Sequence, residues 1–426
     1  MIQEFKKVNS VKGSLTFSGD KSISHRALII SSLANGISEI TNLSIGEDVK
    51  STINCLSSLG IKIEYSQQKS IVVSYGFKGF KKPDGPLFAG NSGTTARLLS
   101  GILSMQDFNS IVTGDSSLSS RPMSRIIEPL TQMGGNLSTS KYGTLPLHIN
   151  RPNKLQAIKY ELPVPSAQVK SAILFAGLCL NDETTVIESI QTRNHTENLL
   201  DLTVDKKNNK FITTASHKNY PIAKNYFIPG DISSAMFFVI LALLTKNSEL
   251  VLRDVSLNQT RIECINLLMR MGGNIEINEK GKSNKEVYGD IIVRSSELQN
   301  VNIDKKIIPL IIDEIPLLTI AGIFADGIFQ LNGASELRVK ESDRIKAICI
   351  NLLKLGLEVE EYQDGFSVTG TIKKSSGTFD SFGDHRIAMT FAILSSLLTE
   401  GNKVENFDCV SVSNPDFLKQ LSSIAS

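Results

Sequence analysis

The sequence contains no tryptophan and few other aromatic residues. Phe, Tyr and Trp together account for 6% of its 426 residues. Proteins that bind single-stranded nucleic acid commonly stack bases on aromatic side chains. The formal net charge is only +2, so the composition also provides no strongly basic surface for a phosphate backbone. We therefore do not expect a nucleic acid partner.

Features of secreted and membrane proteins are also missing. The cysteines are odd in number, scattered and without a CxxC spacing, at Cys55, Cys179, Cys264, Cys349 and Cys409. This pattern argues against a disulfide framework and against a zinc site. The N-terminus has no apolar segment typical of a signal peptide. The most apolar run, Ala235–Leu244, is far shorter than the roughly 20 residues that span a bilayer. We expect a protein of the reducing cytoplasm with no membrane partner.

Common cofactor and hydrolase motifs are absent. The sequence has no GxGxxG after a predicted strand, no GxxxxGK[ST] and no GxSxG. His25, His195 and His385 lie in polar motifs, but their spacing matches no set of metal ligands. The sequence therefore gives no indication of a common nucleotide-binding or hydrolase site, or of a metal bound by histidines.

What the chain does contain is a repeat. Six apolar helices rich in small residues, each preceded by a Gly- or Ser-rich polar turn, are predicted to start near residues 22, 91, 166, 231, 313 and 384. Between them, amphipathic helices end in Gly and run into alternating strands, as in INCLSSLG-IKIEYS and INLLMRMGG-NIEIN. A chain of this length is too long for one ordinary core. The repeat predicts a duplicated α/β fold with two domains of three repeats each.

The domain boundary is expected where this repeat changes phase. Asp201–Phe227 is rich in Lys and Asn and ends at FIPGD, which makes it a candidate hinge. The opening strand, Ile2–Leu15, precedes the first repeat and could belong to either domain.

Polar residues gather at the predicted helix starts. They are Lys21, Ser22, His25 and Arg26 in the first repeat, Asn91 to Thr95 in the second, Ser166, Gln168 and Lys170 in the third, Asp313 and Glu314 in the fifth, and Asp384, His385 and Arg386 in the sixth. Ordinary capping accounts for the hydroxyl, amide and carboxylate groups. It does not account for Lys21, Arg26 and Arg386, because a cation at a helix start opposes the helix dipole. These cations favour a site for an anionic ligand.

A separate segment, Arg338–Arg344 (RVKESDR), is dense in charge and is followed by an apolar stretch with helical spacing. On a helix, Lys340 and Arg344 would point the same way, with Glu341 three residues before Arg344. Two cations beside a carboxylate suit an anionic substrate that exchanges a proton. A solvated first turn with ion pairs is the alternative.

For two further residues, the expected position relative to a helix start is inferred from a nearby proline. Arg121 precedes Pro122, and a proline at the first helical position would leave Arg121 in the cap region; a surface arginine is the alternative. Asp313 lies just before Pro316, where its carboxylate would act either as a general base or as an N-cap.

Taken together, the motifs GDKSISHRAL, AGNSGTTARLL, SSRPM, PSAQVKSA, RNHTE, RVKESDR and GDHRIAM resemble the 5-enolpyruvylshikimate-3-phosphate (EPSP) synthase family over nearly the whole chain. The resemblance implies an inside-out α/β fold of two domains, each with three βαβαββ repeats, and an active site in the interdomain cleft. It implies a domain of residues 19–228 that binds mainly shikimate 3-phosphate. A discontinuous domain of residues 1–18 and 229–426 would complete the phosphoenolpyruvate site.

The resemblance also implies the reaction and its residues. The enolpyruvyl group of phosphoenolpyruvate would be transferred to the 5-hydroxyl of shikimate 3-phosphate through a tetrahedral intermediate, with release of phosphate, in chorismate and aromatic amino acid biosynthesis. The implied catalytic residues are Asp313, Glu341 and Lys21. Those implied for shikimate 3-phosphate are Lys21, Ser22, Arg26, Ser166, Gln168, Thr192, Asp313 and Lys340, with His195 nearby. Those implied for phosphoenolpyruvate, and for the inhibitor glyphosate, are Lys21, Gly93, Arg121, Gln168, Arg344 and Arg386. A cytoplasmic monomer without metal or cofactor is implied.

The sequence departs from some members of the family at two positions. Ala167 replaces a second serine, and Val412 lies in a stretch where some members have a lysine near phosphoenolpyruvate. Two alternatives remain at this point. One is the related enolpyruvyl transferase that acts on UDP-N-acetylglucosamine, which commonly has a cysteine in the loop that here is Gly114–Ser120. The other is a non-catalytic relative that binds anions or RNA ends.

Overall fold

The structure is a computed structural model that describes residues 1–66, 68–399 and 401–426, and in it the chain divides into two compact units. The N-terminal unit comprises residues 18–229 and 282–286. The C-terminal unit comprises residues 1–17, 230–281 and 287–426. One boundary falls between Pro229 and Gly230, inside the FIPGD stretch. The sequence pattern did not indicate that residues 282–286 belong with the N-terminal unit.

The described strands of the N-terminal unit form three sheets. The first contains β14 (Tyr226–Phe227), β3 (Asn35–Thr41), β5 (Lys69–Tyr75) and β4 (Lys62–Glu64). The second contains β6 (Leu87–Phe88), β7 (Ser110–Thr113), β9 (Leu147–Asn150) and β8 (Asn136–Ser138). The third contains β10 (Lys159–Glu161), β11 (Thr184–Glu188), β13 (Lys210–Ala215) and β12 (Val204–Lys207). Each sheet has one parallel pair at its edge and antiparallel pairs elsewhere.

Helices connect these strands in the same order in each repeat. The inner helices are α1 (Lys21–Leu33), α3 (Gly93–Leu103) and α6 (Ala167–Gly177). The outer helices are α2 (Glu47–Ser58), α5 (Ser124–Gln132) and α7 (His195–Leu200), and short turns are formed by η1 (Phe77–Gly79), α4 (Ser116–Ser119) and η2 (His217–Asn219). An inner helix joins the parallel strands β6 and β7, and another joins β10 and β11, as expected for right-handed βαβ crossovers. In the first repeat the parallel partner of β3 is instead β14, from the end of the unit.

The C-terminal unit has a similar plan, except that the described strands of one of its sheets, β18, β20 and β19, pair only in antiparallel fashion. Its sheets contain β2 (Lys12–Leu15), β15 (Glu249–Ser256), β17 (Glu286–Arg294) and β16 (Asn274–Ser283); β18 (Phe329–Leu331), β20 (Gly365–Thr369) and β19 (Glu358–Tyr362); and β1 (Gln3–Phe5), β22 (Asn402–Glu405) and β21 (Thr378–Asp380). Its inner helices are α8 (Ile232–Leu244), α11 (Ile315–Phe324) and α13 (His385–Leu397). The other helices are α9 (Glu263–Arg270), η3 (Lys305–Ile307), α10 (Ile308–Ile311), η4 (Ser335–Val339), α12 (Arg344–Leu353), η5 (Phe407–Val412) and α14 (Phe417–Ile424).

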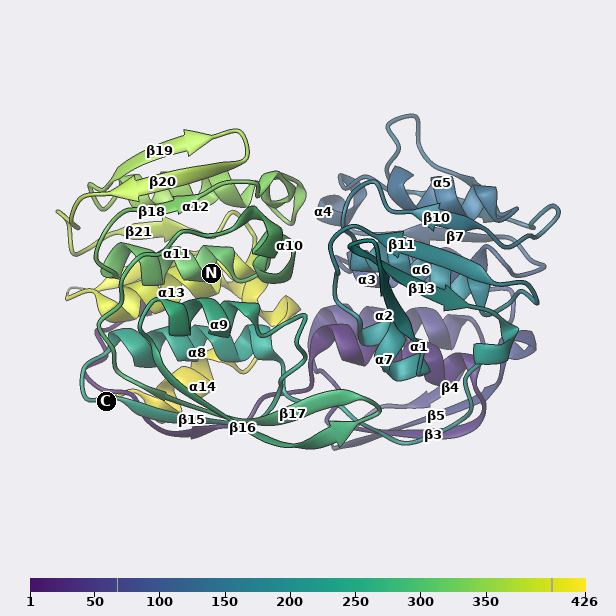
Figure 1. Cartoon of the computed structure of the whole chain (residues 1–426), viewed down its shortest axis with the longest axis horizontal. Coiled ribbons are helices and arrows are strands. Elements are labelled where there is room, and N and C mark those ends of the chain that lie inside the picture. The colour runs from purple at the N-terminus through teal and green to yellow at the C-terminus, as the bar shows by residue number, and fades with distance from the viewer. Residues whose placement is uncertain (67, 400) are drawn as a thin grey trace. The chain divides into compact units, whose positions relative to one another are not determined.

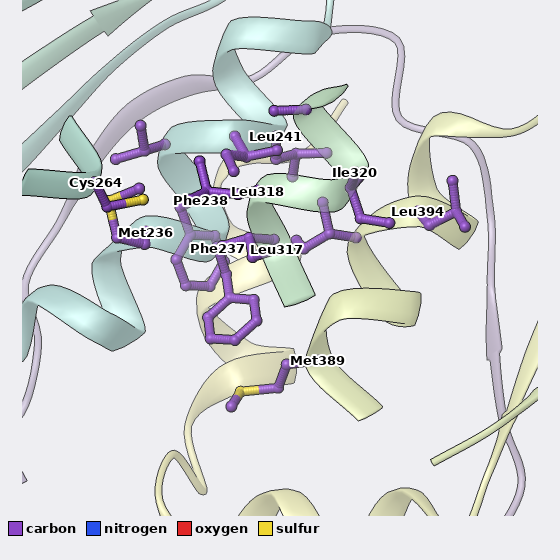
Figure 2. Packing of buried hydrophobic residues seen from close by; sticks show 14 of the residues in the cluster. Met236, Phe237, Phe238, Leu241, Cys264, Leu317, Leu318, Ile320, Met389 and Leu394 are labelled. Carbon is purple, nitrogen blue, oxygen red and sulfur yellow. The ribbon is translucent and has the colours of Figure 1, made fainter. Parts of the chain in front are cut away.

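The inner helices form the core of the C-terminal unit because they are apolar on all sides. α8, α11 and α13 contact one another and lie between the β18–β20 sheet and the β15–β17 sheet (Figure 1). Figure 2 shows Phe237 and Phe238 of α8 next to Leu317 and Leu318 of α11. All four side chains are at most 3% exposed. The polar starts of these helices are therefore held in place by a packed core.

Two expectations about the connections were wrong in detail. Asp201–Phe227, described as a candidate hinge that ends at FIPGD, contains the β12–β13 hairpin and the edge strand β14 of the N-terminal unit, and the chain crosses between the units only after it, within FIPGD. Ile2–Leu15, expected as one strand, contains the two short strands β1 and β2, and both join sheets of the C-terminal unit.

Within the described residues, no single helix is long and apolar enough to cross a membrane. The bent pair Lys305–Ile311 and Ile315–Phe324 passes the same criteria together, but most of Ile315–Phe324 is buried in the core of the C-terminal unit.

Candidate active site

The first helix of the N-terminal unit presents two of the expected cations. Asp20 caps α1 by accepting from the Ile23 N–H at 3.0 Å. Lys21 is the first residue of α1, and its Nζ lies 2.9 Å from Asp48 Oδ2. Ser22 follows, and its carbonyl accepts from Arg26 Nη1 at 3.0 Å. The start of α1 is therefore capped by a carboxylate while it carries the cations that oppose its dipole.

Arg26 is buried and bound mainly to neutral groups. Its Nε donates to Thr196 Oγ1 at 2.7 Å and its Nη2 to Ser171 Oγ at 2.9 Å. Burial lowers the pKa of Arg26 to about 10, against the attraction of Glu197, so the guanidinium stays charged at neutral pH. A buried cation without a carboxylate in hydrogen-bond contact is costly, and an anionic ligand would offset that cost.

A second group forms around the start of α3. Gln168 Nε2 donates to Thr94 Oγ1 at 2.9 Å, next to Gly93. Arg121 Nη2 donates to Asn91 Oδ1 at 2.7 Å. The structure thus brings the expected residues Gly93, Arg121 and Gln168 to one place.

Sequence reasoning missed Arg97, which ties this group together. Arg97 Nη1 donates to Gln168 Oε1 at 2.8 Å, and its Nη2 donates to the Pro122 carbonyl at 3.1 Å. A Cβ on Gly93 would lie 2.6 Å from Arg97 Nη1. The available signal was the spacing of four residues, which places Gly93 and Arg97 on one helix face.

At the third helix start, one polar residue caps the helix and another forms buried ion pairs. Ser166 caps α6 by accepting from the Val169 N–H at 3.4 Å. Lys170 is fully buried, with its Nζ 2.7 Å from both Glu188 and Glu197. Burial alone would lower the pKa of Lys170, but these two carboxylates raise it. Lys170 is therefore bound within the unit and is not a ligand-facing cation.

Thr192, expected to contact shikimate 3-phosphate, is held by the same cluster. Its hydroxyl and its backbone N–H both donate to Glu188 Oε1, and Lys170 Nζ donates to its carbonyl at 3.4 Å. The Thr192 hydroxyl therefore has lone pairs but no proton to offer a phosphate. Nearby, His195 Nδ1 lies 2.9 Å from Glu286 Oε1, and both side chains are fully buried.

In the C-terminal unit, three cations surround Asp313, which lies in the turn between α10 and α11. Arg344 Nη1 and Lys340 Nζ lie 3.3 Å and 3.9 Å from Asp313 Oδ1. Arg386 Nη2 lies 3.8 Å from Oδ2, and Arg386 Nη1 donates to the Asp313 carbonyl at 3.0 Å. The structure thus brings these four expected site residues together.

Arg344 connects this group to two further carboxylates. It is 1% exposed, its Nε donates to Asp384 Oδ2 at 2.8 Å, and its Nη2 donates to Glu341 Oε2 at 2.5 Å. Burial alone would raise the pKa of Asp384, but Arg344 holds it below its ordinary value. Asp384 also caps α13 by accepting from the Arg386 N–H at 2.8 Å. One buried carboxylate therefore holds the Arg344 guanidinium and caps the helix that carries Arg386.

The expected helical turn over RVKESDR is wrong. Asp343 caps α12 by accepting from the Lys346 N–H at 3.0 Å, so the helix begins only at Arg344. Lys340 and Glu341 precede it, with Lys340 in an extended conformation. Glu341 still reaches Arg344, but across a cap and not along one helix face.

A smaller expectation about a helix start was also wrong, and one of the two alternatives for Asp313 is removed. Pro122 precedes α5, which begins at Ser124, so Arg121 follows α4 and does not lie in the cap region of a helix that starts at Pro122. Asp313 does not cap α11, because Glu314 occupies the N-cap position and makes no side-chain cap bond.

Comparisons with known proteins identify the family. Residues 5–421 match the family model described as EPSP synthase (3-phosphoshikimate 1-carboxyvinyltransferase). A Petrotoga mobilis protein of the latter name is 43% identical over 429 residues, which cover 99% of each chain. One from Solibacter usitatus is 44% identical over 98% of each chain. The structure of an EPSP synthase from Acinetobacter baumannii matches with a TM-score of 0.86 and 36% identity, over 100% of this chain and 98% of that one. With its repeated α/β units and its charged helix starts, this chain belongs to the EPSP synthase family.

Proposed function

We propose that this chain transfers the enolpyruvyl group of phosphoenolpyruvate to the 5-hydroxyl of shikimate 3-phosphate and releases phosphate. The observation that carries the proposal is Asp313 among three cations, with Glu341 bound to one of them. Substrates with two phosphates and two carboxylates need several cations, and arginine suits both groups because it can bind them in a bidentate manner. A reaction that both removes and adds a proton needs two acid–base groups.

In the proposed reaction, Asp313 accepts the proton of the 5-hydroxyl of shikimate 3-phosphate, while the oxygen of that hydroxyl forms a bond to C2 of phosphoenolpyruvate. Glu341 donates a proton to C3, which gives the tetrahedral intermediate. Glu341 then takes a proton back from C3 as the C2–O bond to phosphate breaks, and the proton on Asp313 passes to the departing phosphate, which yields the enolpyruvyl ether. Lys21 assists by stabilising the charge that develops on the departing phosphate.

We assign the substrate contacts by the same proposal. Shikimate 3-phosphate is held by Lys21, Ser22, Arg26, Ser166, Gln168, Asp313 and Lys340, and phosphoenolpyruvate by Lys21, Gly93, Arg121, Gln168, Arg344 and Arg386. Thr192 accepts a hydrogen bond from a ring hydroxyl of shikimate 3-phosphate, because its own hydroxyl proton is donated to Glu188. Glu341 becomes available as an acid when a substrate anion takes its place on Arg344.

The proposed reaction is tested by comparing three acceptors for the enolpyruvyl group. Phosphoenolpyruvate is incubated with the protein and either shikimate 3-phosphate, shikimate or UDP-N-acetylglucosamine, and phosphorus NMR records phosphate release and the new ether. We expect product with shikimate 3-phosphate alone. Asp313→Asn should abolish it, whereas the exposed control Asp182→Asn should not. Product with UDP-N-acetylglucosamine would support the related transferase, and no product with any acceptor would support a non-catalytic relative.

A further inference from the structure

A buried carboxylate of the C-terminal unit has so far been given no role. Glu314 is 3% exposed and lies between Asp313 and the start of α11. Its Oε1 accepts from Ser233 Oγ at 2.5 Å, and lies 3.6 Å from Arg261 Nη2 and 3.8 Å from Arg386 Nη1. One carboxylate oxygen therefore faces two guanidinium groups and a hydroxyl.

The second oxygen of Glu314 is buried without a hydrogen-bond partner among the described residues. Leaving a buried charged oxygen without a partner costs stability. Packing does not require a carboxylate here, since the rest of the segment from Ile315 onward is apolar. Such a costly group in a core is better explained by its effect on a neighbouring charge.

The neighbours of Glu314 come from the starts of separate helices. Ser233 lies in the first turn of α8, and its Oγ accepts from Arg261 while it donates to Glu314. Arg261, which precedes α9, is 3% exposed. Arg386 lies in the first turn of α13. Ser233 and Arg261 thus fix Glu314 in place, and Glu314 in turn faces Arg386.

Arg386 has two carboxylates within reach. Its Nη1 lies near Glu314 and donates to the Asp313 carbonyl, whereas its Nη2 stays 3.8 Å from Asp313 Oδ2. Without the negative charge of Glu314, the electrostatic preference of Arg386 would shift to the Asp313 carboxylate. A direct ion pair there would occupy both a proposed base and a proposed ligand of phosphoenolpyruvate.

We propose that Glu314, held by Ser233 and Arg261, is a positioning residue that shares the Arg386 guanidinium with the Asp313 carboxylate and keeps it from closing onto that carboxylate. Both groups are thereby kept ready for substrate. The inference rests on the proposed function, because it assigns Arg386 to phosphoenolpyruvate and Asp313 to proton transfer. It adds a residue that touches neither substrate.

The test distinguishes two roles for Glu314: positioning Arg386, and balancing the buried charge of Arg261. Glu314→Gln alone leaves Arg261 buried without its carboxylate and should lower the melting temperature. The double variant Glu314→Gln with Arg261→Met removes both charges and should recover much of that loss. In both variants we expect the KM for phosphoenolpyruvate to rise on the order of tenfold to a hundredfold, with the KM for shikimate 3-phosphate within about twofold. Ser233→Ala, which keeps the charge of Glu314, should change the KM much less.

The outcomes decide between the two roles. Recovery of the KM for phosphoenolpyruvate together with the melting temperature in the double variant would show that Glu314 only balances Arg261, and would overturn the proposal. An equal rise of both KM values would overturn it too. A crystal structure of the double variant gives a readout independent of turnover: we expect Arg386 Nη2, 3.8 Å from Asp313 Oδ2 in the wild type, to close to hydrogen-bond distance of that carboxylate, and an unmoved Arg386 would contradict the proposal. If the wild type does not turn over, the proposed function fails, while this structural readout still judges Glu314.

Discussion

Buried arginines of the two units are held in different ways. In the N-terminal unit, the hydrogen bonds of the Arg26 guanidinium go to hydroxyl and carbonyl oxygens, although Lys21 of the same helix start pairs with Asp48. In the C-terminal unit, Arg344 and Arg386 lie against the carboxylates of Asp313, Glu314, Glu341 and Asp384. Cations with neutral partners suit the binding of an anion, whereas cations interleaved with carboxylates suit proton transfer beside an anion. We infer that the N-terminal unit contributes mainly to the binding of shikimate 3-phosphate, and that the C-terminal unit carries the proton chemistry and contributes arginines to the binding of phosphoenolpyruvate.

The largest effect should come from removing the proposed acid. Glu341→Gln keeps the size of the side chain but has no proton to donate to carbon. We expect turnover to fall by the roughly 10²–10⁴-fold that general acid–base catalysis contributes, while shikimate 3-phosphate binds within about 1 kcal/mol of the wild type. Phosphate release beside calorimetric binding checks this, with exposed Glu183→Gln as the control. Near-normal turnover would remove Glu341 from the mechanism.

Because Arg344 binds carboxylates and Arg26 binds neutral groups, replacing them should lower the free energy of unfolding by different amounts. Arg344→Gln leaves Asp384 and Glu341 without their cation, and breaking a buried ion pair costs about 3–5 kcal/mol. Arg26→Gln removes hydrogen bonds to neutral groups, at about 1–3 kcal/mol. Urea unfolding of the two variants measures both losses. If the loss in Arg26→Gln equals that in Arg344→Gln, the comparison of the two units is wrong.

Acid should weaken the N-terminal unit first. Burial lowers the pKa of His25 to about 3, against the attraction of Asp48, while an unfolded histidine titrates near 6.5. The unfolded state therefore binds a proton that the folded state does not, and this part of the stability falls by about 1.4 kcal/mol per pH unit between pH 6.5 and 3.

The C-terminal unit should respond later. Burial would raise the pKa of Asp384, but Arg344 lowers it below the ordinary value of an aspartate. The contribution of Asp384 to the free energy of unfolding is therefore fully present when the pH is above that ordinary pKa, and it is lost only as the pH falls below it. Urea unfolding between pH 7 and 5 should show that His25→Gln loses less stability on acidification than the wild type does. Exposed His148→Gln is the control, and an equal acid response in wild type and His25→Gln would contradict the assignment.

The smallest expected effect distinguishes two glycines of α3. A methyl group on Gly93 would lie 2.6 Å from Arg97 Nη1, at the movable end of a side chain. Gly93→Ala should therefore displace Arg97 from Gln168, raise the KM for phosphoenolpyruvate about tenfold and weaken inhibition by glyphosate. A methyl group on Gly101 would lie 2.2 Å from the Ala172 carbonyl oxygen. Gly101→Ala should instead cost about 1–3 kcal/mol of stability.

Enzyme kinetics and thermal melting of both glycine variants check this pair. Unchanged glyphosate inhibition in Gly93→Ala would show that Arg97 and Gln168 do not shape that site.

The sequence predicted those features that depend on local signals. The six inner helices begin close to the expected positions, because residues such as Asp20, Ser92, Ser166 and Asp384 cap them through their own first turns. The motifs of the EPSP synthase family also placed Asp313, Lys340, Arg344 and Arg386 in one site.

Contacts between distant segments were not predictable in this way. Charge spacing alone predicted a helix over RVKESDR, but the cap formed by Asp343 moves the helix start to Arg344. Arg97 and Glu314 were not recognised as site-organising residues, because their partners Gln168, Arg261 and Ser233 are far away in sequence. Lys170 was grouped only with the polar residues at the helix starts, and the fold brings Glu188 and Glu197 against it.

The central claim is that the two units divide the work, and calorimetric titration of shikimate 3-phosphate tests it most directly. The protein is titrated without phosphoenolpyruvate as wild type, as Arg26→Gln in the N-terminal unit and as Arg386→Gln in the C-terminal unit, with exposed Arg151→Gln as the control. The account predicts that Arg26→Gln weakens binding at least about tenfold, because hydrogen bonds to charged groups contribute roughly 1.5–3 kcal/mol, and that Arg386→Gln binds as the wild type does. Equal losses in the two variants, or a loss only in Arg386→Gln, would contradict it.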